Sequence, residues 1–190
     1  MNPESNIGGR ALKPLNLYLI GYRCTGKSSV GRSLAEEFSR SFVDTDALVV
    51  AKQRLSIKEI VGAHGWEGFR QMEHAILKKI CTLDGQVVAA GGGIVLNDRN
   101  VMLMKRSGTI IWLRAKLETI KARMLQDKDT RDFRPALTLN DNISEIEETL
   151  HSREPLYRNA MDFFVDTDDH DIRAVTEIIF EKIKVLDPKK

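Results

Sequence analysis

The sequence predicts an α/β fold, a three-layer sandwich in which a five-stranded parallel sheet carries helices on both faces. Five short apolar runs of strand length alternate with stretches whose apolar residues recur at helical spacing. Because parallel neighbours need a helical crossover between them, this alternation favours a parallel sheet. Glycine or acidic residues follow several of the runs, and ligands of such sheets bind where the carboxyl ends of the strands meet.

The first expected strand, Asn16–Ile20, leads directly into the octet GYRCTGKS at residues 21–28, which we name the phosphate loop. Its two glycines lie five residues apart and are followed by a lysine and a hydroxyl residue, a pattern typical of nucleotide-phosphate binding. After it, Val30, Leu34 and Phe38 recur at helical spacing on a polar stretch. The phosphate loop is therefore expected to join a strand to the N-terminus of a helix.

Each residue type in the phosphate loop has a physical reason to be there. Glycines let successive backbone N–H groups point inward, and the helix N-terminus behind them adds partial positive charge. We expect Lys27 to reach the β- and γ-phosphates and the Ser28 hydroxyl to coordinate Mg²⁺. The alternative is a glycine-rich turn that only joins two elements, and it requires every fixed position of the pattern to match by chance.

The second expected strand, Phe42–Asp46, ends in two carboxylates. Residues 56–59 form a capping-box pattern that opens a short helix, which the glycines at 62 and 65 are expected to end. Apolar residues at helical spacing then predict a long amphipathic helix that reaches Leu83.

The middle of the chain continues the alternation. A buried strand is expected at Gln86–Ala90, and it runs into three glycines, Gly91–Gly93. The elements expected next are a helix capped by Asn97 or Asp98, a strand at Thr109–Leu113 and a helix at Leu117–Leu125.

Residues 126–140 are charged and aperiodic, which predicts a mobile lid. After them come a helix from about Ile143 to Met161, a strand at Phe163–Thr167 and a helix from about Asp171 to Val185. Pro155 is expected to kink or break the first of these helices.

The length of 190 residues favours one domain, at 15–187, preceded by a flexible leader at 1–14. The net charge is +2 and the basic residues are dispersed, so nucleic acid is not an expected partner. The sequence has neither a secretion signal nor an apolar run long enough for a membrane span, so no membrane association is expected. Cys24 and Cys81 lack disulfide or metal-ligand spacing, which favours a reduced, cytoplasmic setting.

The phosphate loop alone is compatible with GTPases, large ATPase modules and small-molecule kinases. The string Asn-Lys-x-Asp, by which GTPases recognise guanine, does not occur in the sequence. The strands at 86–90 and 109–113 end without the acid that ATPase modules place there. Carboxylates instead follow the second strand, at Asp44 and Asp46, where one can serve the Mg²⁺ water shell and the other can face an acceptor hydroxyl. This pattern favours a small-molecule kinase.

Several further motifs occur in a fixed order between residue 16 and about residue 180. They are the phosphate loop with its continuation to Arg32, Phe-Val-Asp-Thr-Asp at 42–46, Phe69-Arg70 with Glu73, Gly91–Gly93, Arg134-Pro135, and Arg153 to Tyr157. In these motifs the chain resembles the shikimate kinases, phosphate-loop kinases whose fold is similar to that of nucleoside monophosphate kinases.

The resemblance implies a monomer that uses ATP and Mg²⁺ to phosphorylate the 3-hydroxyl of shikimate, a step toward the aromatic amino acids. The implied ATP contacts are Arg23, Cys24, Thr25, Gly26, Lys27, Ser28, Ser29, Arg123 and Arg134, with Arg131 as an alternative to Arg123 beside adenine. The implied shikimate contacts are Asp46, Arg70, Gly91, Gly92, Gly93 and Arg153, and the implied metal ligands are Ser28 and Asp44. The implied catalytic residues are Lys27, Asp46 and Arg134.

Residue chemistry agrees with such a substrate. Guanidinium groups bind carboxylates with two parallel hydrogen bonds, and glycines would let the backbone approach a ring that side chains would strike. Other interpretations stay open: a gluconate-type or other sugar-acid kinase, and a non-catalytic descendant that binds nucleotide. Arg70 could instead form a surface ion pair with Glu73, and Arg153 could be a solvated helix residue.

Overall fold

A five-stranded sheet forms the centre of the molecule within the described residues, which are 15–126 and 143–186 of this computed structural model. Its strands are β1 (Asn16–Ile20), β2 (Ser41–Asp44), β3 (Gln86–Ala89), β4 (Gly108–Arg114) and β5 (Phe163–Asp166). They lie in the order β2-β3-β1-β4-β5, and every neighbouring pair is parallel. The predicted fold class is confirmed.

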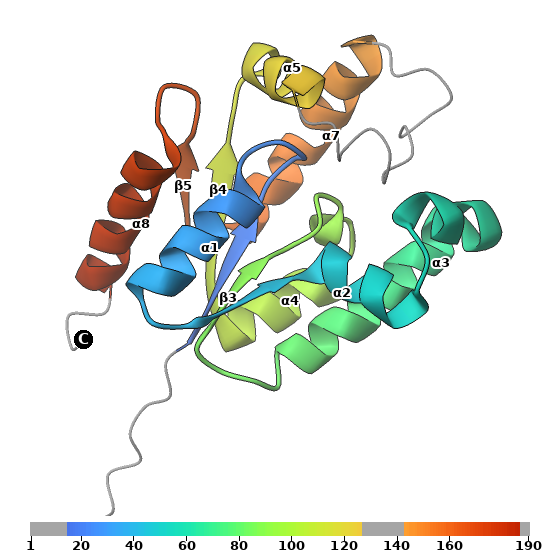
Figure 1. The fold of residues 1–190 in the computed structure, drawn as a ribbon, viewed down its shortest axis with the longest axis horizontal. Helices are drawn as coiled ribbons and strands as arrows, with labels where there is room; N and C mark the ends of the chain where they lie inside the picture. Colours follow the sequence, from blue (N-terminus) through green and yellow to red (C-terminus); the bar gives the residue numbers. More distant parts are fainter. Residues whose placement is uncertain (1–14, 127–142, 187–190) are drawn as a thin grey trace, which may run out of the picture.

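Helices connect the strands and cover both faces of the sheet (Figure 1). They are α1 (Lys27–Glu37), α2 (Thr45–Gln53), α3 (Ile57–Ile80), a 3-10 turn at Ile94–Leu96, α4 (Asp98–Ser107), α5 (Leu117–Gln126), α7 (Ile143–Ala160) and α8 (Ile172–Leu186). Among the helices within the described ranges, none is both long and apolar enough to cross a membrane.

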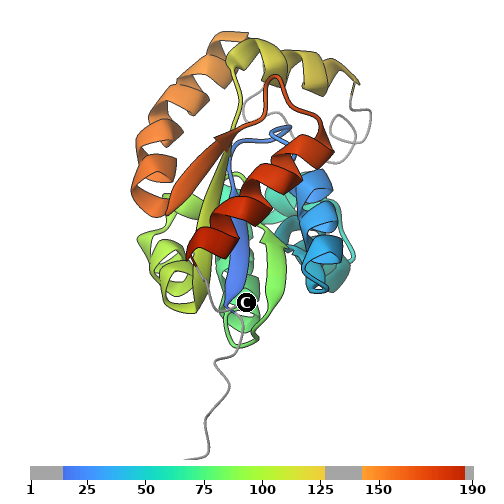
Figure 2. The ribbon, with the colours of Figure 1, turned by 90° about the vertical axis from the view of Figure 1, so that its left-hand side faces the viewer.

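The central strand β1 supplies side chains to a core on each face. Leu17 and Leu19 pack in a cluster with α1 and α8, which contact each other on one face of the sheet. Tyr18 and Ile20 pack in a cluster with residues of α3, α4 and α7 on the other face (Figures 1 and 2). Alternate residues of a strand face opposite ways, so a strand buried on both faces is apolar throughout, as β1 is apart from Asn16.

The predicted second strand, Phe42–Asp46, begins one residue and ends two residues later than β2, and the helix after it was not predicted. β2 ends at Asp44, and α2 begins at Thr45. One oxygen of Asp44, Oδ1, accepts hydrogen bonds from the backbone N–H groups of Asp46 (3.0 Å) and Ala47 (3.2 Å). This is the N-cap interaction for which aspartate is favoured, so the first carboxylate of the pair starts a helix instead of extending the strand.

Three further expectations concern where helices begin and end. The capping box at 56–59 is confirmed, since Ser56 and Glu59 bond each other's backbone N–H groups. The helix that it opens does not end at Gly65 but kinks there, where φ is 66° and ψ is 176°, and the predicted short and long helices are two arms of α3. Of the kink or break predicted at Pro155, the break does not occur, because α7 continues to Ala160.

Candidate active site

The phosphate loop curls between β1 and α1, as the motif predicts. Gly21, Cys24 and Gly26 have positive φ angles, and Gly26 is the N-cap of α1. The Thr25 hydroxyl donates to the Tyr22 carbonyl at 2.8 Å, which fixes the curl from inside. A helix N-terminus leaves its first N–H groups without helical partners, so this loop offers them to an anion.

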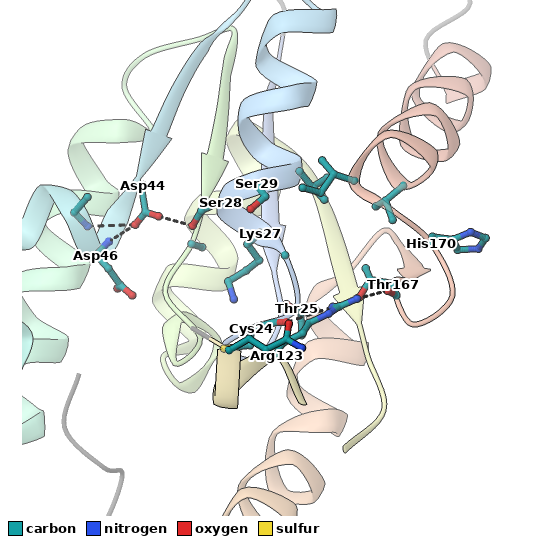
Figure 3. A pocket seen from close by; sticks show the side chains of 18 of the residues that line it. Cys24, Thr25, Lys27, Ser28, Ser29, Asp44, Asp46, Arg123, Thr167 and His170 are labelled. Carbon is teal, nitrogen blue, oxygen red and sulfur yellow. Dashed lines mark hydrogen bonds between the residues drawn. The ribbon is translucent and has the colours of Figure 1, made fainter. Parts of the chain in front are cut away.

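A large cleft of about 830 Å³ opens at the phosphate loop. Residues Cys24 to Ser29 line it, together with Asp44, Asp46, Arg123, Thr167 and His170. Figure 3 shows Asp46 on one side of Lys27 and His170 on the other. The Lys27 ammonium donates to the Tyr22 carbonyl at 2.6 Å, which holds the charge beside the loop. Arg23, predicted with this group, lines a second and smaller pocket.

The predicted metal ligands Ser28 and Asp44 are in contact. The Ser28 hydroxyl donates to Oδ2 of Asp44 at 2.8 Å, while the other oxygen of Asp44 caps α2 (Figure 3). Mg²⁺ binds oxygens at about 2.0–2.1 Å in an octahedron, so neighbouring ligands lie about 3 Å apart. The two oxygens therefore fit adjacent positions around Mg²⁺, directly or through a bound water.

The smaller pocket, about 60 Å³, gathers all of the predicted acceptor-binding residues except Gly91, and they come from four parts of the chain. It is lined by Tyr22, Arg23, Asp46, Ile57, Trp66, Phe69, Arg70, Gly92, Gly93 and Arg153. Asp46 and Ile57 also line the large cleft, so the two cavities meet there. One carboxylate thus faces both a phosphate-binding site and a pocket with arginines.

Arg70 is not part of a surface ion pair. Its Nη1 donates to Oε2 of Glu73 at 2.7 Å, and the Glu73 side chain is 0% exposed. The guanidinium also lies near the rings of Trp66 (5.4 Å to the centroid) and Phe69 (5.3 Å). A buried carboxylate and two rings therefore hold Arg70 in the pocket.

Sequence reasoning did not assign Trp66 and Phe69 to the pocket. In the structure the Trp66 ring packs edge-on against Phe69, and both rings line the pocket. The i to i+3 spacing of Arg70 and Glu73 signals contact on a helix. Spacing carries no information on burial, which depends on what packs over the helix.

The glycine run is needed for a reason that differs from the predicted one. A Cβ on Gly91 would overlap Oε1 of Glu73 and would lie 2.6 Å from Oδ1 of Asp46. A Cβ on Gly93 would overlap the guanidinium of Arg70. The glycines therefore make room first for the charged side chains of the protein itself, before any ligand is considered.

Two residues of α7 hold the carbonyl of Gly92. Arg153 donates to it through Nη1 at 3.2 Å, and the Tyr157 hydroxyl donates to it at 2.5 Å. Arg153 lines the smaller pocket, so it is not simply a solvated helix residue.

Arg123 links the phosphate loop to the connection between β5 and α8. Its Nη1 donates to the Cys24 carbonyl (3.3 Å) and to the Thr167 hydroxyl (3.0 Å), and its Nη2 donates to the Thr167 carbonyl. It thus lies at the end of the cleft away from Asp46 (Figure 3). Arg131, Arg134 and most of the expected lid lie outside the described residues.

Glu73 gives the site a titration that stability measurements can detect. Burial raises the pKa of Glu73 from 4.5 to about 7; Arg70 opposes this rise and Asp46 adds to it. Because the pKa of Glu73 is higher in the folded than in the unfolded protein, Glu73 stabilises the fold fully below pH 4.5. This stabilisation is lost as the pH increases through 7. Relative to Glu73→Gln, which does not titrate, the wild type is expected to lose about 3 kcal/mol of unfolding free energy across this range.

Urea unfolding of both proteins at pH values from 5 to 8 measures this difference. The informative quantity is the slope of the unfolding free energy against pH. The substitution also changes the contact with Arg70, but by an amount that does not depend on the titration. Parallel stability curves for the two proteins would show that Glu73 keeps an ordinary pKa.

Known proteins resemble this chain in sequence and in fold. A family model described as shikimate kinase matches residues 23–184. A shikimate kinase of Caldanaerobacter subterraneus is 40% identical over 162 residues, 85% of this chain and 92% of that protein. One of Pseudomonas paraeruginosa is 34% identical over 175 residues, 92% of this chain and 99% of that protein.

A solved structure described as the shikimate kinase of Acinetobacter baumannii in complex with shikimate superposes with a TM-score of 0.81 at 28% identity, covering 93% of this chain and 95% of that one. The Aquifex aeolicus shikimate kinase superposes with a TM-score of 0.76 at 26% identity, covering 93% and 100%. Sequence identity over most of the chain and the matched fold lead to the same conclusion: the chain belongs to the shikimate kinase family.

Proposed function

We propose that this protein transfers the γ-phosphoryl group of MgATP to the 3-hydroxyl of shikimate, giving shikimate 3-phosphate and ADP. The observation that carries the proposal is the meeting of two cavities at Asp46, one lined by the phosphate loop and the other by Arg23, Arg70 and Arg153. A donor phosphate and an acceptor hydroxyl can then approach the same carboxylate. Relatives named shikimate kinase at 40% and 34% identity support the choice of substrate.

The acceptor needs a partner for its carboxylate and one for its hydroxyls. Arg70 and Arg153 offer guanidinium groups, which match a planar carboxylate better than lysine does. Asp46 lies where the two cavities meet and can accept a hydrogen bond from a substrate hydroxyl, so it orients the hydroxyl that reacts. It is also the group in position to take the proton of that hydroxyl.

In the reaction the hydroxyl oxygen bonds to the γ-phosphorus while the bond from that phosphorus to the bridging oxygen of ADP breaks. Charge spreads over the phosphoryl oxygens, so positioning and electrostatics provide most of the acceleration. Lys27 supplies a cation from the phosphate loop, and we assign Arg134 a similar role from the sequence. Ser28 and Asp44 would hold Mg²⁺, which adds positive charge at the phosphates.

The direct test is ADP formation with Mg²⁺ and ATP, measured with and without shikimate. Turnover is expected only when shikimate is present, and gluconate and quinate as acceptors should give little. Equal rates with gluconate would support a sugar-acid kinase instead. ATP binding with no turnover on any acceptor would support a non-catalytic nucleotide-binding protein.

Gly93→Ala is expected to raise the KM for shikimate at least about tenfold. The new methyl group would displace the Arg70 guanidinium from its place beside Glu73, and hydrogen bonds between charged groups are worth about 1.5–3 kcal/mol. Gly62→Ala is the matched control, since a Cβ there has no described atom within 4 Å. Steady-state kinetics that leave both variants like the wild type would show that Arg70 does not need this position.

We further propose that the enzyme works as a monomer in the cytoplasm. Cys24 lines the nucleotide cleft and forms no disulfide with Cys81, so a reducing compartment suits the site. Light scattering after size-exclusion chromatography should give a mass near 21.5 kDa at assay concentration. A mass near twice that value would contradict the monomer.

A further inference from the structure

The carbonyl of Gly92 accepts two hydrogen bonds from one helix. Arg153 and Tyr157 are four residues apart on α7, so their side chains lie on the same face. Nη1 of Arg153 lies 3.2 Å from the carbonyl oxygen, and the Tyr157 hydroxyl lies 2.5 Å from it. A carbonyl oxygen has two lone pairs, so both donors can bind at once.

The two donors differ in mobility. Tyr157 is 2% exposed, and its ring stacks on Trp112 of the central part of the sheet at 5.7 Å between centroids and 22° between planes. Burial also raises the pKa of the Tyr157 hydroxyl, which therefore remains a protonated donor. Arg153 has a long side chain at the edge of the smaller pocket. The Tyr157 ring is held by its packing, whereas Arg153 is only partly buried and has more side-chain torsions about which it could turn.

Gly92 lines the smaller pocket and also lies against the phosphate loop, which lines the large cleft. A Cβ on it would be 3.4 Å from the Gly21 carbonyl and 3.6 Å from the Arg23 nitrogen, so it packs against the backbone of the phosphate loop. If the Gly92 carbonyl lost both of its hydrogen-bond donors, it would be left buried without a partner, at a cost in free energy. If the Arg153 guanidinium were the sole hydrogen-bond donor to the Gly92 carbonyl, it would be less available to a ligand in the pocket.

We propose that Tyr157 is a positioning residue that keeps the Gly92 carbonyl bonded and so frees the Arg153 guanidinium to turn toward the carboxylate of the acceptor. This inference rests on the proposed function, because it takes the acid as the ligand of Arg153. Tyr157 itself contacts no reacting group. It acts through Arg153 and through the packing of Gly92 against the backbone of the phosphate loop.

The test is Tyr157→Phe, which keeps the ring on Trp112 and removes only the hydroxyl. The KM for shikimate is expected to increase about five- to tenfold, with kcat and the KM for ATP within about twofold of the wild type. The same change in an Arg153→Ala background should have no further effect on the KM for shikimate, since the group through which it acts is gone.

Tyr18→Phe is the matched control. Tyr18 is also fully buried, and its hydroxyl contacts Ser107 (2.7 Å) and Cys81 (3.3 Å), which precede β4 and β3 at the other end of the sheet. Its loss should lower stability and leave the KM for shikimate unchanged. Thermal unfolding of all variants shows whether each is folded at the assay temperature.

Three results would overturn the inference while the wild type stays active. They are an unchanged KM for shikimate in Tyr157→Phe, equal increases of KM for shikimate and ATP, and an undiminished effect in the Arg153→Ala background. A wild type without shikimate-dependent turnover would instead refute the proposed function.

Discussion

Replacing Lys27 with methionine is expected to lower kcat for phosphoryl transfer about a thousandfold, the largest loss predicted for any single substitution. The ammonium lies inside the curl of the phosphate loop, 2.6 Å from the Tyr22 carbonyl, where a triphosphate would approach it. Methionine keeps the length and volume of the side chain but removes the charge. Removing one preorganised donor from a transition state typically costs between a hundredfold and a thousandfold in kcat.

Lys105→Met provides the control for this loss. Lys105 lies on α4 and donates a hydrogen bond to the Asn159 carbonyl at 2.9 Å. It lines neither of the two cavities. A coupled assay for ADP should find this variant close to the wild type. If Lys27→Met kept more than a tenth of wild-type kcat, the phosphate loop would not have the role assigned to it.

The second large effect is expected for Asp46→Asn, which should lower kcat at least about a hundredfold. Asparagine can still accept a hydrogen bond from a hydroxyl but cannot take its proton, and general-base contributions are typically a hundredfold or more. A loss confined to KM would mean that Asp46 only binds the acceptor.

Stability separates this chemical effect from damage to the fold. The charge of Asp46 raises the pKa of buried Glu73, which means that the two carboxylates repel each other. Removing that repulsion stabilises the folded state at pH 8 and offsets part of any other contact that the Asp46 carboxylate loses. The backbone N–H of residue 46, which Asp44 caps, is unaffected by the substitution. A variant that was both inactive and much less stable would point to a structural role.

The sequence predicted the donor side of the site well because its pattern is local. The phosphate loop lies within eight consecutive residues: its glycines shape the backbone, and its lysine and serine follow at fixed positions, so the pattern depends little on the rest of the chain. The alternation of strands and helices likewise follows from short-range periodicity. β1 was therefore predicted with its observed bounds, Asn16–Ile20.

The acceptor side depends on packing between distant segments, and there the sequence was less informative. The burial of Glu73 and the contact of Gly93 with Arg70 depend on how α3 packs against the segment after β3. The spacing of residues along one helix does not contain them. Helix α2 was missed because an aspartate can end a strand or cap a helix, and the local sequence alone does not distinguish the two.

The two oxygens of Asp44 have a consequence for how the substrate range of such an enzyme can change. One oxygen contacts Ser28, and the other fixes the first turn of α2, which carries Asp46. The Asp44 oxygen proposed for the metal and the Asp46 carboxylate proposed for the acceptor therefore lie on a single backbone turn with no hinge between them. New acceptors of different size would have to be accommodated by substitutions on α3 and α7, while this turn stays invariant.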